Sequence, residues 1–193
     1  MTRLLISAGY LPLPAWLILV TVAGLITPGY SPIVSHASVM TLEEGASLWI
    51  TNSAALISGV ALIAFGLGVW SASQRMVSGG GLCWTVFGIS MVANGIWPMG
   101  TPMHGLYAIG IINILGPALT VLETRDEALR QRLIGFTVFC SLAGVFYLWI
   151  ILTGLDPEAY SGLTQRIFGS INFLWPLVFA YRALWTDAAH DTL

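Results

Sequence analysis

The sequence contains no lysine, and only 8% of its 193 residues are charged, whereas 56% are hydrophobic. Soluble domains carry about 25% charged residues, and a soluble core of this size cannot hide so much apolar surface. The composition therefore excludes a soluble globular domain and predicts an all-α, polytopic membrane protein. Without lysine there can be no retinal Schiff base, and a net charge of −2 gives no basis for nucleic-acid binding.

Metal-binding and nucleotide-binding patterns are also missing. Cys83 and Cys140 lie apart in apolar segments and form no CxxC pair, which argues against a disulfide framework or a zinc site. The histidines show no HxxxH or HExxH spacing, and no lysine follows the glycine run 79–81 as it would in a phosphate-binding loop. The sequence therefore implies no metal and no cofactor, and a bound lipid is the ligand class that we consider.

One uncharged run, from Met76 to Leu122, is too long for a single membrane crossing. Its 47 residues would extend about 70 Å as one helix, over twice the ~30 Å hydrocarbon core of a bilayer. The run must fold back once. Pro98 and Pro102 mark the turn, because each proline pushes the preceding residue out of the helical region.

The whole chain, residues 1–193, is predicted to form one bundle of six transmembrane helices. Their approximate ranges are 11–27, 46–71, 82–97, 104–121, 133–155 and 166–185. The charged segment 123–132 is expected to be a solvated helical connection. Six crossings place both termini on one side, and that side has most of the arginines: Arg3, Arg75, Arg125, Arg130, Arg132 and Arg182. Since basic residues favour the cytoplasmic side, we expect both termini there and Arg166 on the outer face.

The outer face also gathers the residue types that can do chemistry. His104 opens the fourth span and can serve as a ligand or proton carrier, or it can simply hydrogen-bond a helix end. His36, Ser38 and Glu44, in the loop after the first span, join His104 as candidate catalytic residues. General acid–base catalysis would require these groups to come within hydrogen-bond reach through the tertiary fold.

A second set of outer residues is predicted to bind a ligand. Arg166 begins a helix, the end at which the helix dipole disfavours a cation, so it needs a partner. Glu158, Asp156 or an anionic lipid headgroup could each be the partner of Arg166. Polar residues within spans are explained either by interhelical hydrogen bonds or by a ligand. The predicted ligand-binding set is Ser38, Asn52, Trp97, His104 and Arg166.

Several short segments, taken in order, resemble the bacterial and archaeal six-span membrane proteins catalogued as domain of unknown function 998. The matching pieces are Tyr30-Ser31 with Ser38, Asn52 with Ser58-Gly59, Gly95-Ile96-Trp97-Pro98 with His104, and Gly162-Leu163-Thr164-Gln165-Arg166. The resemblance implies six spans, a prokaryotic inner membrane and a set of outer-face positions, but no activity. The family commonly has an acidic residue soon after the proline of the Trp-Pro turn, whereas Met99, Gly100 and Thr101 follow it here.

Three functions remain open at this point. The first is a protein that binds a lipid or another apolar ligand, or an accessory subunit of a membrane complex, with lipids and other membrane subunits as partners. The second is a membrane-embedded hydrolase or transferase acting on lipid through outer-face histidine, serine and glutamate. The third is a transporter, which would need an ionisable or unwound element near the membrane midplane.

Overall fold

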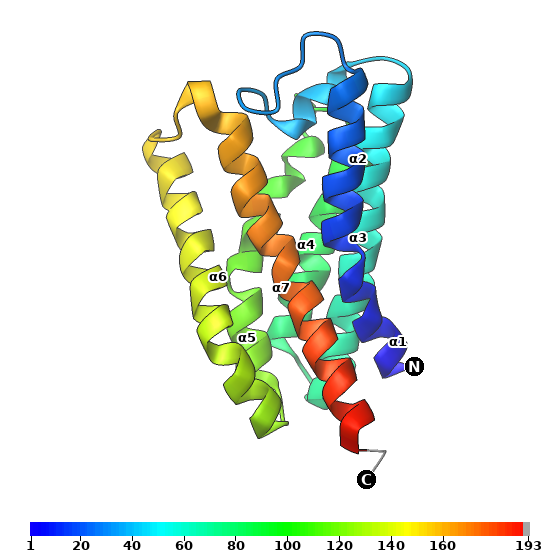
Figure 1. Cartoon of the computed structure of the whole chain (residues 1–193), viewed down its shortest axis with the longest axis vertical. Helices are drawn as coiled ribbons and strands as arrows, with labels where there is room; N and C mark the ends of the chain where they lie inside the picture. The colour runs from blue at the N-terminus through cyan, green and yellow to red at the C-terminus, as the bar shows by residue number, and fades with distance from the viewer. Residues whose placement is uncertain (191–193) are drawn as a thin grey trace.

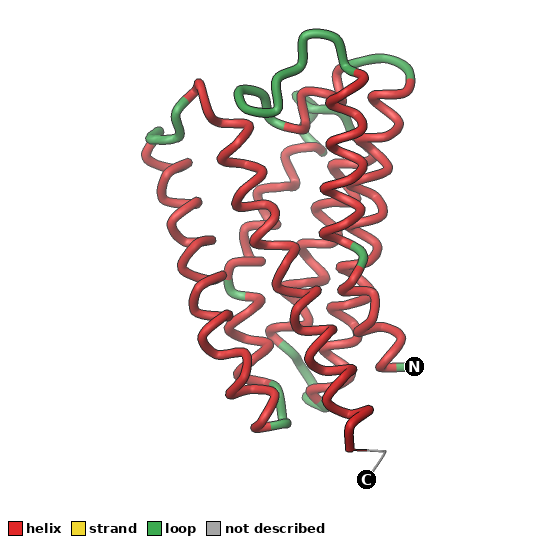
Figure 2. Tube along the Cα trace, in the orientation of Figure 1, coloured by secondary structure: helices red, strands yellow, loops and turns green. Residues whose placement is uncertain are grey.

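The computed structural model describes residues 1–190, with the side chains of residues 105, 107, 108 and 186–190 left out. In this part of the chain every regular element is a helix, which confirms the all-α class (Figure 1, Figure 2). The α-helices are α1 (Thr2–Ser7), α2 (Pro12–Ile26), α3 (Ala46–Ser73), α4 (Gly79–Ile96), α5 (Gly116–Glu123), α6 (Glu127–Thr153) and α7 (Ser161–His190). The 3₁₀ helices are η1 (Ala8–Tyr10), η2 (Ala37–Leu42), η3 (His104–Ile114) and η4 (Glu158–Tyr160).

Among the residues that the structure describes, five helical segments are long and apolar enough to cross a membrane. They are Thr2–Ile26, Ala46–Ser73, Gly79–Ile96, Glu127–Thr153 and Glu158–Trp185, with 18 to 28 residues each. At about 1.5 Å per residue, even the shortest approaches the ~30 Å thickness of the hydrocarbon core. The fold is therefore that of a multi-pass membrane protein, and five of the six predicted spans correspond to long apolar helices.

The predicted fourth span, 104–121, has a different structure from the other five. It is divided into the 11-residue 3₁₀ helix η3 and the 8-residue α5, which meet at Leu115. Pro117 lies in the first turn of α5, where its missing N–H is tolerated, and it cannot continue a helix that arrives from η3. A 3₁₀ run longer than three or four residues is uncommon, so this break is a distinctive feature of the bundle.

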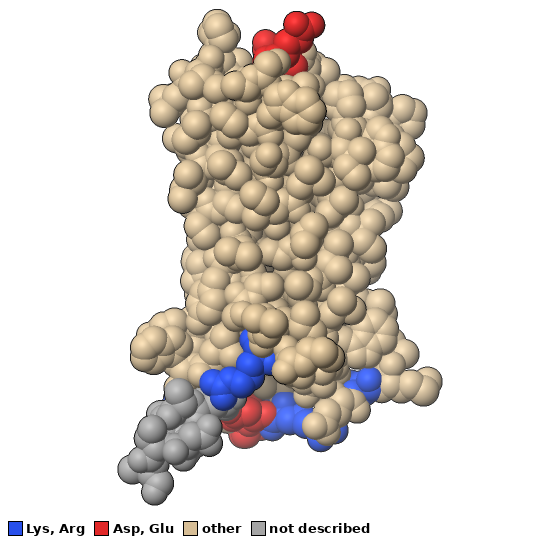
Figure 3. Space-filling view, turned by 90° about the vertical axis from the view of Figure 1, so that its right-hand side faces the viewer, with Lys and Arg blue, Asp and Glu red and all other residues tan. Residues whose placement is uncertain are grey.

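The two ends of the bundle differ in composition. The N-terminus and the last turns of α7 lie at one end, which we call the basic end (Figure 1). Space-filling Figure 3 shows arginines gathered there. The opposite end, which we call the cap end, is covered by the connection from Thr27 to Gly45, here named the cap loop (Figure 2).

Aromatic side chains fill the centre of the bundle. Trp84 of α4 stacks on Trp175 of α7, with ring centroids 5.3 Å apart, and Phe65 of α3 meets Trp84 edge-on. The indole N–H groups donate to threonine hydroxyls, Trp84 to Thr120 and Trp175 to Thr137, each at 3.0 Å. Because the membrane interior offers no water, these hydroxyls satisfy donors that would otherwise be costly to bury.

Helices α3 and α4 approach closely along their length. A Cβ atom placed on Gly59 would lie 2.7 Å from the Gly88 carbonyl oxygen, and one on Gly66 would lie 2.7 Å from the Gly81 carbonyl oxygen. Small residues at matching positions let two backbones pack directly in a membrane protein. This rigid pair positions the start of α3 and the end of α4, where the cap-end cavity described below lies.

Candidate functional site

The cap loop is attached to the start of α7 by Arg166. One guanidinium nitrogen, Nη1, donates to the carbonyl oxygens of Pro32 at 2.8 Å, Ser35 at 3.2 Å and Gly162 at 2.9 Å. The other, Nη2, donates to the Tyr30 hydroxyl, and the guanidinium carbon lies 5.6 Å from the centre of the Tyr30 ring. Backbone carbonyls and an aromatic ring therefore stabilise the cation at the unfavourable end of the helix.

Other residues in the first two turns of α7 also bind the cap loop. The Ser161 hydroxyl donates to the Val34 carbonyl at 2.7 Å, and the Gln165 side chain accepts from the Ala37 N–H at 2.7 Å. Gly162 is required at its position, since a Cβ there would lie 2.4 Å from the Ser35 carbonyl oxygen. The Gly162-to-Arg166 motif singled out in the sequence is thus the strip of α7 on which the cap loop packs.

His104 closes the turn between α4 and η3. Its ring nitrogen Nδ1 lies 2.8 Å from the Trp97 carbonyl oxygen, and the residue is 7% exposed. A carbonyl only accepts, so Nδ1 carries the proton and Nε2 is the acceptor in the neutral ring. Trp97 takes part in this contact through its backbone.

Thr41 joins the cap loop to the same turn. Its hydroxyl donates to the Ser38 carbonyl at 2.6 Å and accepts from the Met99 N–H at 2.9 Å. The fold therefore links the segment around Ser38 to the turn closed by His104, through the Thr41 hydroxyl. No local pattern marks Thr41, because its partner Met99 is distant in the chain.

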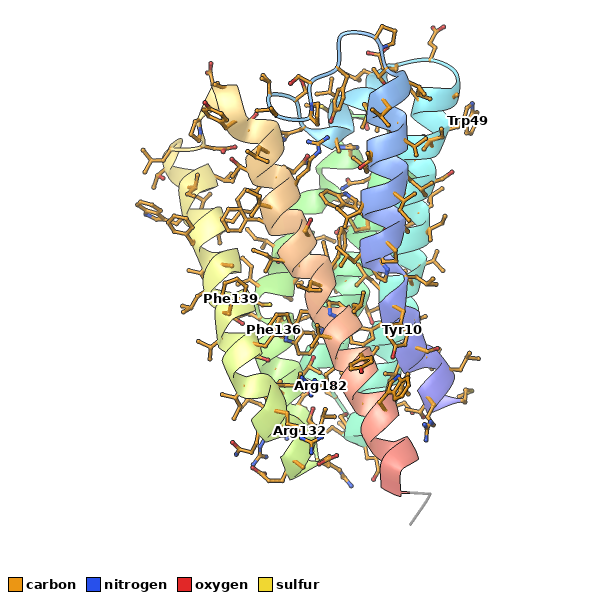
Figure 4. All side chains as sticks on the ribbon, viewed as in Figure 1. Tyr10, Trp49, Arg132, Phe136, Phe139 and Arg182 are labelled. Carbon is orange, nitrogen blue, oxygen red and sulfur yellow. The ribbon has the colours of Figure 1, made fainter. Side chains whose placement is uncertain are left out.

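A cavity of about 430 Å³, which we call the cap-end cavity, lies between α3, η2 and the end of α4. Its apolar walls come from Leu48, Leu56 and Ile96, and its polar groups from Thr41, Asn52 and Ser53. Trp49, Gly95 and Pro98 complete the lining. Trp49 itself is 70% exposed and points away from the bundle (Figure 4).

The predicted ligand-binding residues divide into two groups around this cavity. Asn52 lines it, and Trp97 lies between two lining residues, Ile96 and Pro98. Ser38, His104 and Arg166 are absent from the lining and instead hold the cap loop and the turn in place.

The four catalytic candidates are not joined to one another by hydrogen bonds. The described part of the chain has no side-chain hydrogen bond between any two of His36, Ser38, Glu44 and His104. His36 caps η2, its carbonyl accepting from the Val39 N–H, and Glu44 is exposed. Within the same residues no group of three or more histidine, cysteine, aspartate or glutamate side chains is arranged to hold a metal ion.

Long apolar helices, polar connections at the two ends and buried indole groups that donate to threonine hydroxyls define an integral membrane protein. The chain belongs to the family described as protein of unknown function (DUF998), whose model matches residues 11–182. This match confirms the family resemblance noted in the sequence, and it includes the cap loop, the cap-end cavity and the first turns of α7. No curated protein and no solved structure shows significant similarity to the chain.

Proposed function

We propose that the protein crosses a prokaryotic inner membrane six times, with both termini in the cytoplasm. At about 2.0 Å per residue for η3 and 1.5 Å for α5, the broken segment would extend about 34 Å, which is enough to cross the hydrocarbon core. The orientation is supported by the arginines. Six of the seven lie in segments at the basic end, and Arg166 lies at the cap end.

Within this topology, the proposed function is to bind a membrane lipid or another apolar molecule in the cap-end cavity. The observation that supports it is the cavity itself, whose volume of about 430 Å³ falls in the ordinary range for ligand pockets. Leucine and isoleucine side chains suit a hydrocarbon chain, and Asn52 with Thr41 offers hydrogen bonds to a polar group. An amphiphile such as a lipid has both parts.

The site favours binding over catalysis. His104 is buried with one ring nitrogen bonded to the Trp97 carbonyl, which suits a structural role in the turn. A lipid-modifying hydrolase or transferase built from His36, Ser38, Glu44 and His104 would need these groups to move together on substrate binding. Binding requires no such rearrangement, and an accessory subunit of a membrane complex would use the same cavity to hold a lipid against its partner.

Native mass spectrometry of the purified protein in mild detergent tests the proposal. Ser53→Phe would place a ring in the cavity, whereas Val60→Phe adds the same ring to a position on α3 that is 60% exposed. We expect the wild type and Val60→Phe to retain a lipid-sized molecule and Ser53→Phe to lose it. A wild-type protein that keeps no apolar molecule would contradict the proposal.

A transporter is the second candidate, because one observation favours it. The break at Leu115 places non-α backbone inside a proposed membrane span, and discontinuous spans form the binding sites of many transporters. If η3 moves during transport, we expect its amide hydrogens to exchange with solvent far faster than those of α4. Equal protection in both helices would remove the basis for this candidate.

A further inference from the structure

A second cavity, of about 240 Å³, lies at the basic end and does not belong to the site above. We call it the basic-end pocket. Its inner wall is apolar and buried, formed by Ile6, Val69, Leu129 and Phe179. Polar and charged residues also line the pocket, among them Thr2, Arg3, Ser73, Glu123, Thr124, Arg125 and Asp126. The pocket is therefore apolar on one side and charged on the other.

Both carboxylates of this lining already serve as helix caps. Glu123 accepts from the Ser78 hydroxyl at 2.6 Å and from the N–H groups of Gly79 at 2.8 Å and Gly80 at 3.2 Å, at the start of α4. Asp126 accepts from the Leu129 N–H at 3.0 Å, at the start of α6. Each helix N-terminus carries roughly half a positive charge, which offsets much of the negative charge of its cap.

The two arginines of the lining are held differently. Arg125 donates to the neutral side-chain oxygen of Gln74 at 2.8 Å, and Arg3 donates to the carbonyl oxygen of Leu184 at 3.2 Å. A guanidinium has five N–H donors in a planar fork that matches phosphate oxygens. Arg125 is exposed at the rim of the pocket, so its donors can reach an incoming anion.

The position of the pocket indicates where such an anion would come from. Trp185, 65% exposed near the end of α7, and the arginine cluster lie at the same end of the molecule. Tryptophan and arginine side chains are typical of the depth at which lipid headgroups lie. A phosphate held at the rim would let an attached hydrocarbon chain contact the apolar wall.

We propose that the basic-end pocket binds the phosphate group of an anionic phospholipid through Arg125. This site is separate from the cap-end cavity. A negative result for it would therefore not contradict the proposed function. A soluble phosphate compound would share the chemistry at Arg125, but it would leave the apolar wall of the pocket unused.

The test measures lipid binding by the full-length purified protein with three probes: phosphatidylglycerol, phosphatidylcholine and inorganic phosphate. Arg125→Gln removes one guanidinium from the pocket, and Arg75→Gln is the matched control, since Arg75 lies at the same end outside the lining. We expect phosphatidylglycerol to bind in preference to phosphatidylcholine. Arg125→Gln should weaken phosphatidylglycerol binding about tenfold, the size expected for a lost charge-assisted hydrogen bond, whereas Arg75→Gln should change it about twofold or less.

Two results would overturn the proposal. Equal weakening by Arg125→Gln and Arg75→Gln would mean that the lipid responds to the overall charge of the basic end and not to the pocket. Inorganic phosphate binding as tightly as phosphatidylglycerol would assign the pocket to a soluble phosphate compound. Thermal unfolding of both variants controls for folding, and Arg125→Lys should restore only part of the affinity, because lysine lacks the planar fork.

Discussion

Arg166 and Arg125 are both arginines next to the start of a long helix, yet the fold uses them in opposite ways. Arg166, at the cap end, donates to three backbone carbonyls and the Tyr30 hydroxyl. Arg125, at the basic end, donates to one neutral side chain, and a cavity opens beside it. A charge at the end of a span is therefore a binding candidate only where the folded chain leaves its donors accessible.

The carboxylates show the same contrast. At the basic end, Glu123 fastens α4 to α5 with three hydrogen bonds. At the cap end, Glu43 and Glu44 are exposed, and the loop is held by arginine and hydroxyl contacts with backbone carbonyls. The basic end is thus held together by a negative group at a helix N-terminus, and the cap end by a positive group among carbonyl oxygens.

Removing Glu123 should have the largest effect. Glu123→Ala leaves the Ser78 hydroxyl and the Gly79 and Gly80 N–H groups without their acceptor, which we expect to cost about 3 kcal/mol. Thermal unfolding in detergent measures the loss. Glu127→Ala, which removes an exposed carboxylate at the start of α6, is the control and should change the unfolding temperature little. If Glu123→Ala and Glu127→Ala lowered the unfolding temperature equally, the Glu123 cap of α4 would not be the contact that stabilises the basic end.

Arg166→Gln should have the next largest effect, about 2 kcal/mol, because it removes the charged donor shared by the cap-loop carbonyls. The cap loop should then become sensitive to limited proteolysis between Thr27 and Gly45. Arg130→Gln, which removes a surface partner of Glu127, serves as the control. An unchanged digestion pattern in Arg166→Gln would contradict the role assigned to this residue.

Gly162→Ala should cost about 1 to 2 kcal/mol, because its methyl group would press on the Ser35 carbonyl and displace the loop. Gly135→Ala, on α6 with open space around the position, should be neutral or slightly stabilising. Comparing the unfolding temperatures of the two variants separates the contact from the general effect of alanine in a helix. A neutral Gly162→Ala would show that the strip does not hold the loop closely.

His104→Phe should have the smallest effect, about 1 kcal/mol, through loss of the bond to the Trp97 carbonyl. Lipid retention measured by native mass spectrometry should stay as in the wild type, because His104 does not line the cap-end cavity. If the variant loses the bound molecule while its unfolding temperature is unchanged, His104 takes part in binding, and the division of residues made above is wrong.

Most of the fold could be predicted from the sequence, because apolar runs and prolines determine where the chain can cross a membrane. The length of the uncharged run requires a turn, and Pro98 and Pro102 mark its position. The sequence prediction does not include the break at Leu115, because it treats the span 104–121 as one continuous helix although Gly116-Pro117 lies within it. The Gly116-Pro117 pair is the sequence signal that indicates a break in this helix.

The site was harder to predict, because its contacts join distant positions through backbone atoms. The sequence predicts Glu158, Asp156 or an anionic lipid headgroup as the partner of Arg166, but its carbonyl partners in the cap loop have no side-chain signature in the sequence. Glu123 was placed in a solvated connection, although it bonds Ser78, 45 positions earlier. Asn52, which lines the cap-end cavity, is visible in the sequence as a polar residue within an apolar span, and its role in binding stays a prediction.

The most direct test of lipid binding at the cap end is a cryo-electron microscopy map of the protein in a lipid nanodisc. We expect elongated density in the cap-end cavity, against Leu48 and Leu56 and ending near Asn52. The same density should be absent from the map of Ser53→Phe and present in that of Val60→Phe. A wild-type map in which side chains close the cavity, or in which only water fills it, would contradict the proposed function.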